Sequence, residues 1–238
     1  MGACGVVRLK IHGRMTLPPG EGRTIRLEGR LTGPAPGQAT FQWTLPGGEK
    51  REGAVLEYTP PPDVNRFELK LAATEAKGEV STAQAYLSVP PPELAQLPGR
   101  IIKIEAEDFV AQGGGEVALY ADHINVSGKA VTEWYKSIGQ WLEWEFAAPA
   151  DGEYVFYARY ATRLDGRARR LTLDGASPGP EYEKIIFPCT GGWSVSEDDW
   201  GFMKLGPPVR LKAGKHRLRM ENLNSAVNLD YIIVTVPR

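Results

Sequence analysis

Three carboxylates in apolar, strand-like segments are the residues of this sequence whose types and spacing most clearly point to chemistry. Glu105 and Glu107 are two residues apart, so on a strand both would project from the same face. Asp230 lies in the last apolar run, where an unpaired carboxylate is costly to bury. An all-oxygen ligand set suits a hard cation such as Ca²⁺ better than zinc. We predict a calcium site formed by these three residues; the alternative is that they face solvent on an edge strand.

Aromatic residues beside glycines form a second candidate set. Trp134 and Tyr135 precede a glycine in a turn-like stretch, and Trp193 follows two glycines. Loop aromatics belong to the core less often than strand aromatics and can offer a ligand an apolar platform. The alternative is that they only cover one end of the fold. Trp43 and Trp144, in contrast, alternate with polar neighbours in strand-like runs, and we expect both in hydrophobic cores.

Charged residues gather in two further places. The acidic segment 196–200 could offer acceptors to a ligand, although a run of acids is typical of a solvated loop. Arginines cluster around a predicted turn at Asp165-Gly166, and we interpret them as solvated hairpin charge. Arg159 lies within an apolar strand, so we expect it to pair with a buried acid.

Catalytic signatures are weak in this sequence. Residues 175–179 have the letters of a nucleophile elbow, but Pro178 lacks the backbone N–H that an oxyanion hole needs after the nucleophile. The three histidines are scattered along the chain, and no zinc-binding helix or phosphate-binding glycine loop occurs. The sequence therefore predicts a protein that is not an enzyme.

Composition excludes several classes of partner. Of 238 residues, 28 are Lys or Arg and 29 are Asp or Glu, and this balance argues against nucleic acid as the main partner. No apolar run approaches the roughly 20 residues of a membrane helix, so we expect no membrane insertion. The two cysteines, Cys4 and Cys189, lie in different halves and are predicted to be free thiols. The 27 glycines and 19 prolines favour many short strands, and hence an all-β fold.

A proline-rich segment divides the chain. We predict a first domain over residues 1–90, a semi-rigid linker over 91–98 and a second domain over 99–238. The first domain shows six or seven short alternating runs, which is typical of a small β-sandwich. The runs Phe41-Gln42-Trp43, Glu57-Tyr58-Thr59-Pro60 and Phe67 to Leu71 resemble polycystic-kidney-disease-like and related immunoglobulin-like modules. The resemblance implies that this domain is a spacer.

The second domain carries the more specific resemblance. It opens on Ile102 to Phe109, continues through Gly139 to Phe146 and Thr190-Gly191-Gly192-Trp193, and ends on Val227 to Val234. In this order the segments resemble carbohydrate-binding modules of families 6 and 35, which are galactose-binding-like β-jelly rolls. The resemblance implies a structural calcium at Glu105, Glu107 and Asp230. It also implies a sugar-binding site at the loop end of the sandwich.

At that site the resemblance implies that aromatic residues flank a sugar ring and an asparagine binds the hydroxyl groups. The matching residues are Tyr135 or Trp134, Trp193 and Asn228, and the choice between Trp134 and Tyr135 stays open. The expected ligand is a polysaccharide or oligosaccharide, with uronic-acid polymers as one alternative. The same resemblance implies a monomeric part of a larger multidomain protein that is extracellular, periplasmic or at the cell surface.

Two other functions remain open on the sequence alone. The jelly roll could be a structural module that mediates protein contacts without sugar affinity. It could also be a small carbohydrate-active hydrolase that uses the loop from Glu197 to Asp199. If the domain is instead the carbohydrate-binding module that the resemblance implies, we expect glycan binding without turnover. Such a targeting module raises the local concentration of its parent protein on polysaccharide.

Overall fold

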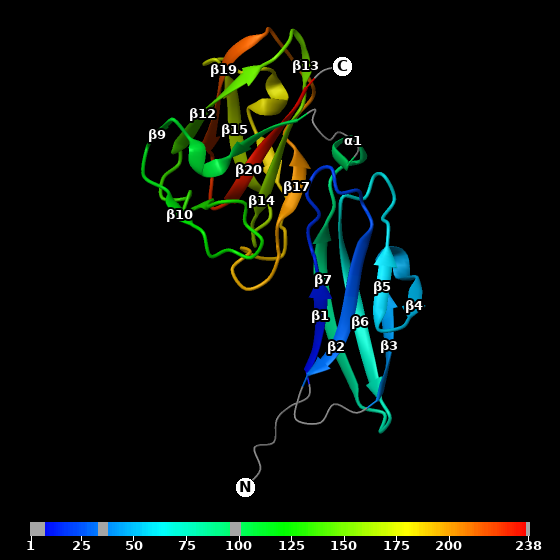
Figure 1. Cartoon of the computed structure of the whole chain (residues 1–238). Helices are drawn as coiled ribbons and strands as arrows, with labels where there is room; N and C mark the ends of the chain where they lie inside the picture. Colours follow the sequence, from blue (N-terminus) through cyan, green and yellow to red (C-terminus); the bar gives the residue numbers. More distant parts are fainter. Residues whose placement is uncertain (1–7, 33–37, 96–100, 237–238) are drawn as a thin grey trace. The chain divides into compact units, whose positions relative to one another are not determined.

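Alternating apolar and polar residues produce strands along nearly the whole chain (Figure 1). The structure is a computed structural model that describes residues 8–32, 38–95 and 101–236. Two units, residues 1–95 and 96–238, each enclose a hydrophobic core of their own. The predicted all-β fold class is therefore confirmed.

The first unit is a β-sandwich of two antiparallel sheets. One sheet has the strand order β1-β2-β5 and the other β4-β3-β6-β7. Ile25 and Leu27 from the first sheet and Trp43, Leu69 and Leu71 from the second fill the core between them, as the alternation predicts. The strands are β1 (Arg8–Gly13), β2 (Ile25–Thr32), β3 (Ala39–Thr44), β4 (Lys50–Glu52), β5 (Val55–Tyr58), β6 (Arg66–Glu75) and β7 (Val80–Ser88).

The segment predicted to be an extended linker begins as a helical turn. Pro92–Ala95 forms α1, in which Leu94 and Ala95 donate hydrogen bonds to the carbonyl of Pro91 and Leu94 is fully buried. Proline is tolerated at the first position of a helix because its missing N–H is not needed there. Residues 96–98 of the predicted linker lie outside the described residues. At four residues, α1 is far too short to cross a bilayer, and the described residues contain no helix that could.

The second unit is a jelly roll with two main sheets. The larger has the order β10-β11-β20-β14-β17, with β8 also paired to β20, and the smaller has the order β16-β15-β19-β12-β9. A short pair, β13-β18, completes it. Its strands are β8 (Ile101–Glu105), β9 (Ala111–Gly113), β10 (Ala118–Tyr120), β11 (Ala130–Thr132), β12 (Trp141–Ala148), β13 (Gly152–Tyr154), β14 (Phe156–Ala161), β15 (Arg167–Leu173), β16 (Ile185–Phe187), β17 (Gly201–Lys204), β18 (Val209–Leu211), β19 (Gly214–Asn222) and β20 (Asn228–Thr235).

Strand β20 lies at the centre of the larger sheet and is buried along its whole length. Its register against β14 shifts so that Tyr231 pairs with Arg159 and Leu229 with Tyr160, which leaves Asp230 as the extra residue of a β-bulge. Bulges re-aim side chains and occur often beside functional sites. Both polar residues predicted on this strand, Asn228 and Asp230, must therefore find partners inside the protein.

Candidate functional site

A hollow of about 250 Å³ opens where loops from separate parts of the second unit meet. Its walls include Tyr120, His123, Tyr135, Trp193 and Asn228, and most of its exposed lining is apolar. These residues come from β10, the loops after β10, β11 and β16, and the start of β20. The fold thus brings together Tyr135, Trp193 and Asn228, three of the four residues that the sequence singled out for a ligand.

Two strained backbone positions hold the aromatic walls of this hollow. Glu133, two residues before Tyr135, has φ 55°, and Ser194, directly after Trp193, has φ 57°. Residues other than glycine seldom adopt this left-handed conformation, and it persists where the surrounding structure enforces it, often at binding sites. Tyr135 is 52% exposed, and Trp193 is partly buried. Both rings are therefore accessible beside backbone positions of restricted conformation.

Trp134 does not belong to this site. The side chain is fully buried, its Nε1 donates to the carbonyl of Gln140 at 3.1 Å, and its ring packs edge-on against Trp144 at 6.3 Å. The chain turns directly after β11, and in this turn Trp134 enters the core while Tyr135 lines the hollow. The structure therefore corrects the prediction for Trp134, whereas Trp144 and Trp43 are core residues as expected.

Asn228 is buried, and the NH₂ group of its side-chain amide contacts other residues of the protein. Its Nδ2 donates to the carbonyl of Trp193 at 3.0 Å and lies 3.3 Å from Nε2 of His123. Its Oδ1 receives no hydrogen bond from any described residue. The amide therefore fixes the loop that carries Trp193 and keeps one acceptor for a ligand.

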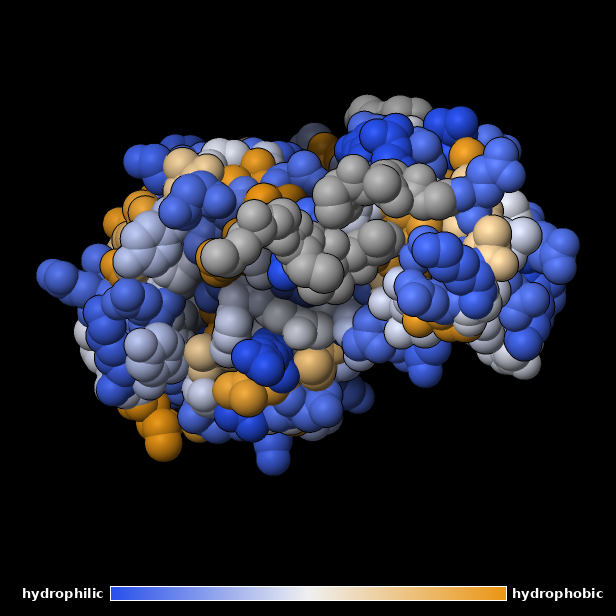
Figure 2. All heavy atoms as spheres, turned by 90° about the horizontal axis from the view of Figure 1, so that it is seen from below, coloured by the Kyte–Doolittle hydropathy of each residue, from blue (hydrophilic) through white to orange (hydrophobic). Residues whose placement is uncertain are grey.

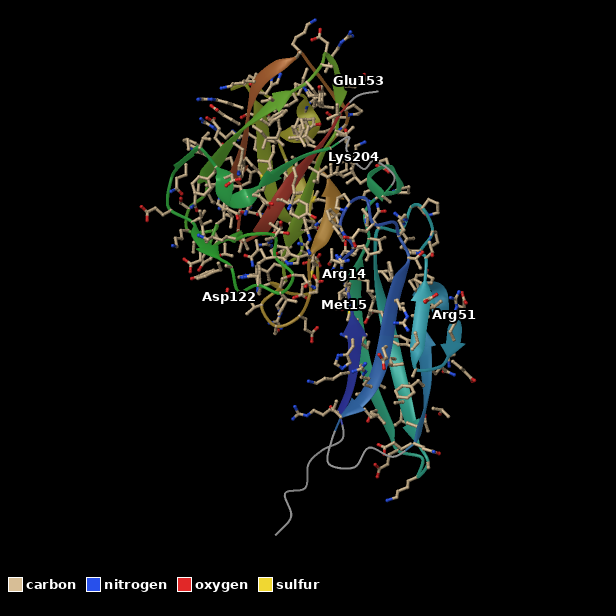
Figure 3. All side chains as sticks on the ribbon, viewed as in Figure 1. Arg14, Met15, Arg51, Asp122, Glu153 and Lys204 are labelled. Carbon is tan, nitrogen blue, oxygen red and sulfur yellow. The ribbon has the colours of Figure 1, made fainter. Side chains whose placement is uncertain are left out.

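Tyr120 and His123 are site residues that sequence reasoning missed. Tyr120 is 43% exposed, and its ring stacks on His123 with the planes 16° apart and the centroids 6.1 Å apart. Asp122, between them in sequence, lies on the loop after β10 (Figure 3). No motif with a known binding role marks Tyr120 or His123 in the sequence, so only the position of this loop against β20 could identify them.

A second, more polar hollow of about 280 Å³ shares Trp193 with the first. Arg163, Glu197 and Asp199 also line it. The acidic loop is only partly solvated, because Asp198 is buried, accepts a hydrogen bond from Asn125 at 2.8 Å and lies 4.0 Å from Arg159. The expectation of a simple solvated loop is therefore wrong for Asp198.

The three predicted metal ligands all contact one loop. Glu105 accepts from Ser127 Oγ at 3.0 Å, Asp230 accepts from the Ser127 N–H at 2.8 Å, and Glu107 accepts from the Lys129 N–H at 2.6 Å. Glu107 is not on the strand, as predicted, but on a 3₁₀ turn that follows β8. The carboxylates thus converge although the predicted strand geometry is wrong for one of them.

Gly128 shows how closely this loop approaches the acids. It has φ 75°, and a Cβ placed there would lie 2.1 Å from Oε1 of Glu107. Only glycine can occupy such a position. The glycine therefore allows the loop backbone to approach the Glu107 carboxylate closely enough for the Lys129 N–H to donate to it.

Asp230 is paired with an arginine. The side chain is fully buried, and Oδ2 accepts a hydrogen bond from Arg159. This confirms the expected pairing of Arg159 with a buried acid. Burial raises the pKa of Asp230 to about 6, although the Arg159 charge and the Ser127 N–H both act to lower it. Edge-strand exposure, the alternative for Asp230, is excluded.

Two of these three carboxylates have an oxygen available to a cation, and the third does not. Oε2 of Glu105 and Oε2 of Glu107 are buried without a hydrogen-bond partner, which is what a hard cation would satisfy. Both oxygens of Asp230, however, already accept hydrogen bonds, and Lys103 lies 2.6 Å from Oε1 of Glu105. Across the described residues, no three acidic, histidine or cysteine side chains stand in a metal-binding arrangement. The calcium site stays a prediction.

One member of the arginine cluster is a core residue. Arg169 is fully buried, stacks over Trp134 at 4.6 Å and donates to Asn222 Oδ1 and the Ser225 carbonyl at 2.8 Å. Burial, with a smaller contribution from Arg167, lowers the pKa of Arg169 to about 9. Solvated hairpin charge is therefore the wrong interpretation for this side chain.

The chain matches solved structures of proteins from three organisms, among others. A GH26-CBM35 β-(1,4)-mannanase from Podospora anserina is 20% identical over 58% of this chain, with a TM-score of 0.46. CBM35 from Cellvibrio japonicus Abf62 is 16% identical over 58% of this chain and 94% of its own, with a TM-score of 0.44. A Paenibacillus xanthan lyase is 13% identical over 91% of this chain and 22% of its own, with a TM-score of 0.43.

The mannanase is much longer than the part of it that matches, which is 28% of that chain. None of the curated proteins matches the sequence. The family model for the carbohydrate binding module (family 6) matches residues 105–236, which are 132 of the 238 residues. That segment contains the carboxylates, both hollows and Asn228, and because the match covers more than half of the chain, the protein belongs to family 6 of the carbohydrate binding modules.

Proposed function

We propose that this chain is a non-catalytic module that binds a polysaccharide or oligosaccharide in the hollow between Tyr135 and Trp193. One observation carries the proposal. Within the matched family segment, loops far apart in sequence present two accessible aromatic rings and the free acceptor of Asn228 around one hollow.

Each wall has a distinct physical role in this proposal. The C–H faces of a sugar ring are apolar and pack on aromatic rings, which Tyr120, Tyr135 and Trp193 supply. Hydroxyl groups need directional partners, and Asn228 Oδ1 would accept from one of them. Arg163, in the neighbouring polar hollow, would be placed to meet a carboxylate if the ligand is a uronic-acid polymer.

Affinity electrophoresis tests the proposal with four soluble polysaccharides: glucomannan, xylan, mixed-linkage β-glucan and polygalacturonate. We expect at least one to retard the protein without release of reducing ends. Trp193→Ala should abolish the retardation because it removes a wall of the hollow.

Tyr86→Ala is the matched control, because Tyr86 is an exposed aromatic residue of the first unit. Retardation that persists in Trp193→Ala would place the binding site elsewhere. Release of reducing ends would instead support the hydrolase alternative, and no retardation by any polymer would support a structural module.

In the proposed role, the module holds a parent protein against polysaccharide and raises its local concentration there without chemistry. Such a ligand is met outside the cytoplasm, so we propose an extracellular, periplasmic or cell-surface location. A larger, multidomain parent protein is part of the same proposal.

We also propose that calcium stabilises this module. Glu105 and Glu107 would hold it through their unpartnered Oε2 atoms, with Asp230 as the predicted third acid. The bound ion would neutralise like charges at the junction of β8, β20 and the loop at residues 127–129.

Chelation tests the calcium proposal. We expect EDTA to lower the melting temperature and added Ca²⁺ to restore it, because an ion that binds only the folded state stabilises it. Glu107→Gln should remove this dependence. Glu153→Gln, which changes an exposed carboxylate on β13 (Figure 3), should leave it intact. A melting temperature indifferent to EDTA and Ca²⁺ in the wild-type protein would contradict the proposal.

A further inference from the structure

The orientation of the Asn228 amide follows from its neighbours. A backbone carbonyl can only accept a hydrogen bond, so the Asn228 atom 3.0 Å from the Trp193 carbonyl must be the NH₂ nitrogen. The same nitrogen lies 3.3 Å from Nε2 of His123. Nε2 can accept the second N–H of this amide only when the imidazole is neutral with its proton on Nδ1.

The surroundings of His123 favour this arrangement. The ring is buried, and Nδ1 has no hydrogen-bond partner but lies 3.5 Å from Oδ1 of Asp122. Tyr120 stacks on one side, and Trp200 lies at 6.2 Å. The ring therefore has little freedom to rotate, and its Nε2 stays directed at Asn228.

We propose that His123 is a positioning residue that holds Asn228 with Oδ1 available to the ligand, and that carbohydrate binding therefore weakens when His123 is protonated. This inference rests on the proposed function. It assigns His123 a role in specificity: the neutral ring makes Asn228 an acceptor, so the site selects a ligand hydroxyl that donates at that point.

Protonation of His123 removes the acceptor that the Asn228 NH₂ group needs. A protonated imidazole donates from both nitrogens, so its Nε2–H meets the N–H of Asn228 instead of accepting from it. If the amide turns over to accept that proton, its Oδ1 faces the Trp193 carbonyl and Nδ2 faces the hollow. Either response costs a hydrogen bond, and the second also replaces the ligand's acceptor with a donor.

Other charged groups around the ring set the context for this titration. Asp122 is on the same loop, and its side chain is 85% exposed. Glu133 lines the same hollow and is paired with Lys136 at 2.8 Å. Arg159 lies over the Trp200 indole, with its guanidinium carbon 5.2 Å from the ring centroid. Imidazole is the side chain whose charge ordinarily changes between pH 5 and 8, so affinity is to be measured over that range.

A first experiment needs no ligand. Long-range ¹H–¹⁵N NMR spectra of the full chain distinguish the two neutral tautomers of each histidine. We expect the proton of His123 on Nδ1 at pH 8, and the Asn228 side-chain amide signals should shift as His123 titrates. A proton on Nε2 at that pH would overturn the inference whatever the protein binds.

A second experiment measures affinity from pH 5 to 8 with whichever neutral polysaccharide of the panel is bound, so that the ligand itself does not titrate. The wild-type protein should bind about tenfold more weakly at pH 5 than at pH 8, the effect of losing one hydrogen bond. His123→Gln should bind at both pH values with nearly equal affinity, because the Gln amide can accept from Asn228 and does not titrate. His123→Phe should bind weakly throughout, because it keeps a ring but no acceptor.

His12→Gln is the matched control, because His12 is an exposed histidine on β1 of the first unit and does not line the hollow. It should keep the wild-type pH profile. An unchanged pH profile in His123→Gln would overturn the inference while leaving the proposed function intact. If no polysaccharide is bound at any pH, the proposed function fails, and the NMR result alone decides the role of His123.

Discussion

Trp134 and Tyr135 are neighbours with opposite environments. The indole of Trp134 is enclosed by Trp144 and Arg169, whereas the phenol ring of Tyr135 is half exposed at the hollow. The strained φ of Glu133 sets the direction in which the chain enters this segment. The turn that follows Glu133 therefore decides which of the two aromatic residues lines the hollow.

At the residue scale, the two rings should respond differently to truncation. Trp134→Ala should lower the free energy of unfolding by roughly 3–5 kcal/mol, because it leaves a large cavity in the core. Tyr135→Ala should leave the unfolding midpoint nearly unchanged and weaken carbohydrate binding about tenfold or more. Urea unfolding and affinity electrophoresis of the two variants measure both effects. Equal loss of stability in both would contradict the assignment.

At the scale of elements, β15 and β19 are joined at one end by a histidine–carboxylate pair. Nδ1 of His216 lies 2.7 Å from Oδ2 of Asp174, and Nε2 lies 2.8 Å from the Lys212 carbonyl. Burial acts to lower the pKa of His216, but the hydrogen bonds to Lys212 and Asp174 and the Asp174 charge outweigh it, so the pKa is raised. The pKa of Asp174 is lowered: burial opposes this, and the Arg217 N–H and His216 outweigh it.

These pKa shifts define the pH range over which the His216–Asp174 pair stabilises the fold. The raised pKa of His216 stabilises the fold below the ordinary histidine pKa of about 6.5, and this contribution is lost as the pH rises through the folded-state value. The lowered pKa of Asp174 stabilises the fold above about pH 4 and is lost on further acidification. Thermal melts should show that His216→Gln loses stability near pH 5 and little at pH 8. An equal loss at both would contradict the charged pair.

A second connection at this scale joins three elements through acids. The loop at residues 127–129 is held by Glu105 at the end of β8, Glu107 on the following turn and Asp230 at the bulge of β20. The same loop begins just after Asn125, which bonds Asp198. The carboxylate cluster and the hollow beside Tyr135 and Trp193 therefore both contact the stretch of chain between β10 and β11.

At the scale of the whole molecule, the two units have separate cores. No described residue of the first core cluster belongs to the second. Hydrophobic residues on the face shown in Figure 2 lie scattered among hydrophilic ones. A unit with a closed core and its own hydrogen-bonded sheets can fold by itself.

This separation predicts that residues 96–238 fold alone. Both hollows and the carboxylate cluster lie entirely within that unit, so the fragment should bind polysaccharide with the affinity of the full chain. Calorimetry should show a cooperative transition for the fragment. A fragment that folds but binds at least tenfold more weakly would mean that the first unit contributes to the site.

The sequence by itself determined the all-β fold and the core positions of Trp43 and Trp144, and it predicted that Trp193 and Asn228 meet an aromatic residue at position 134 or 135. Strand alternation is local, and the order of segments follows the family pattern, so both can be read along the chain. The tertiary structure decided the burial of Trp134 and Arg169, the position of Glu107 in a 3₁₀ turn, and the place of His123 beside Asn228. Several of the contacts behind those outcomes join residues far apart in sequence, such as His123 and Asn228, 105 residues apart, or Glu107 and Lys129, 22 apart, and no local pattern encodes such contacts.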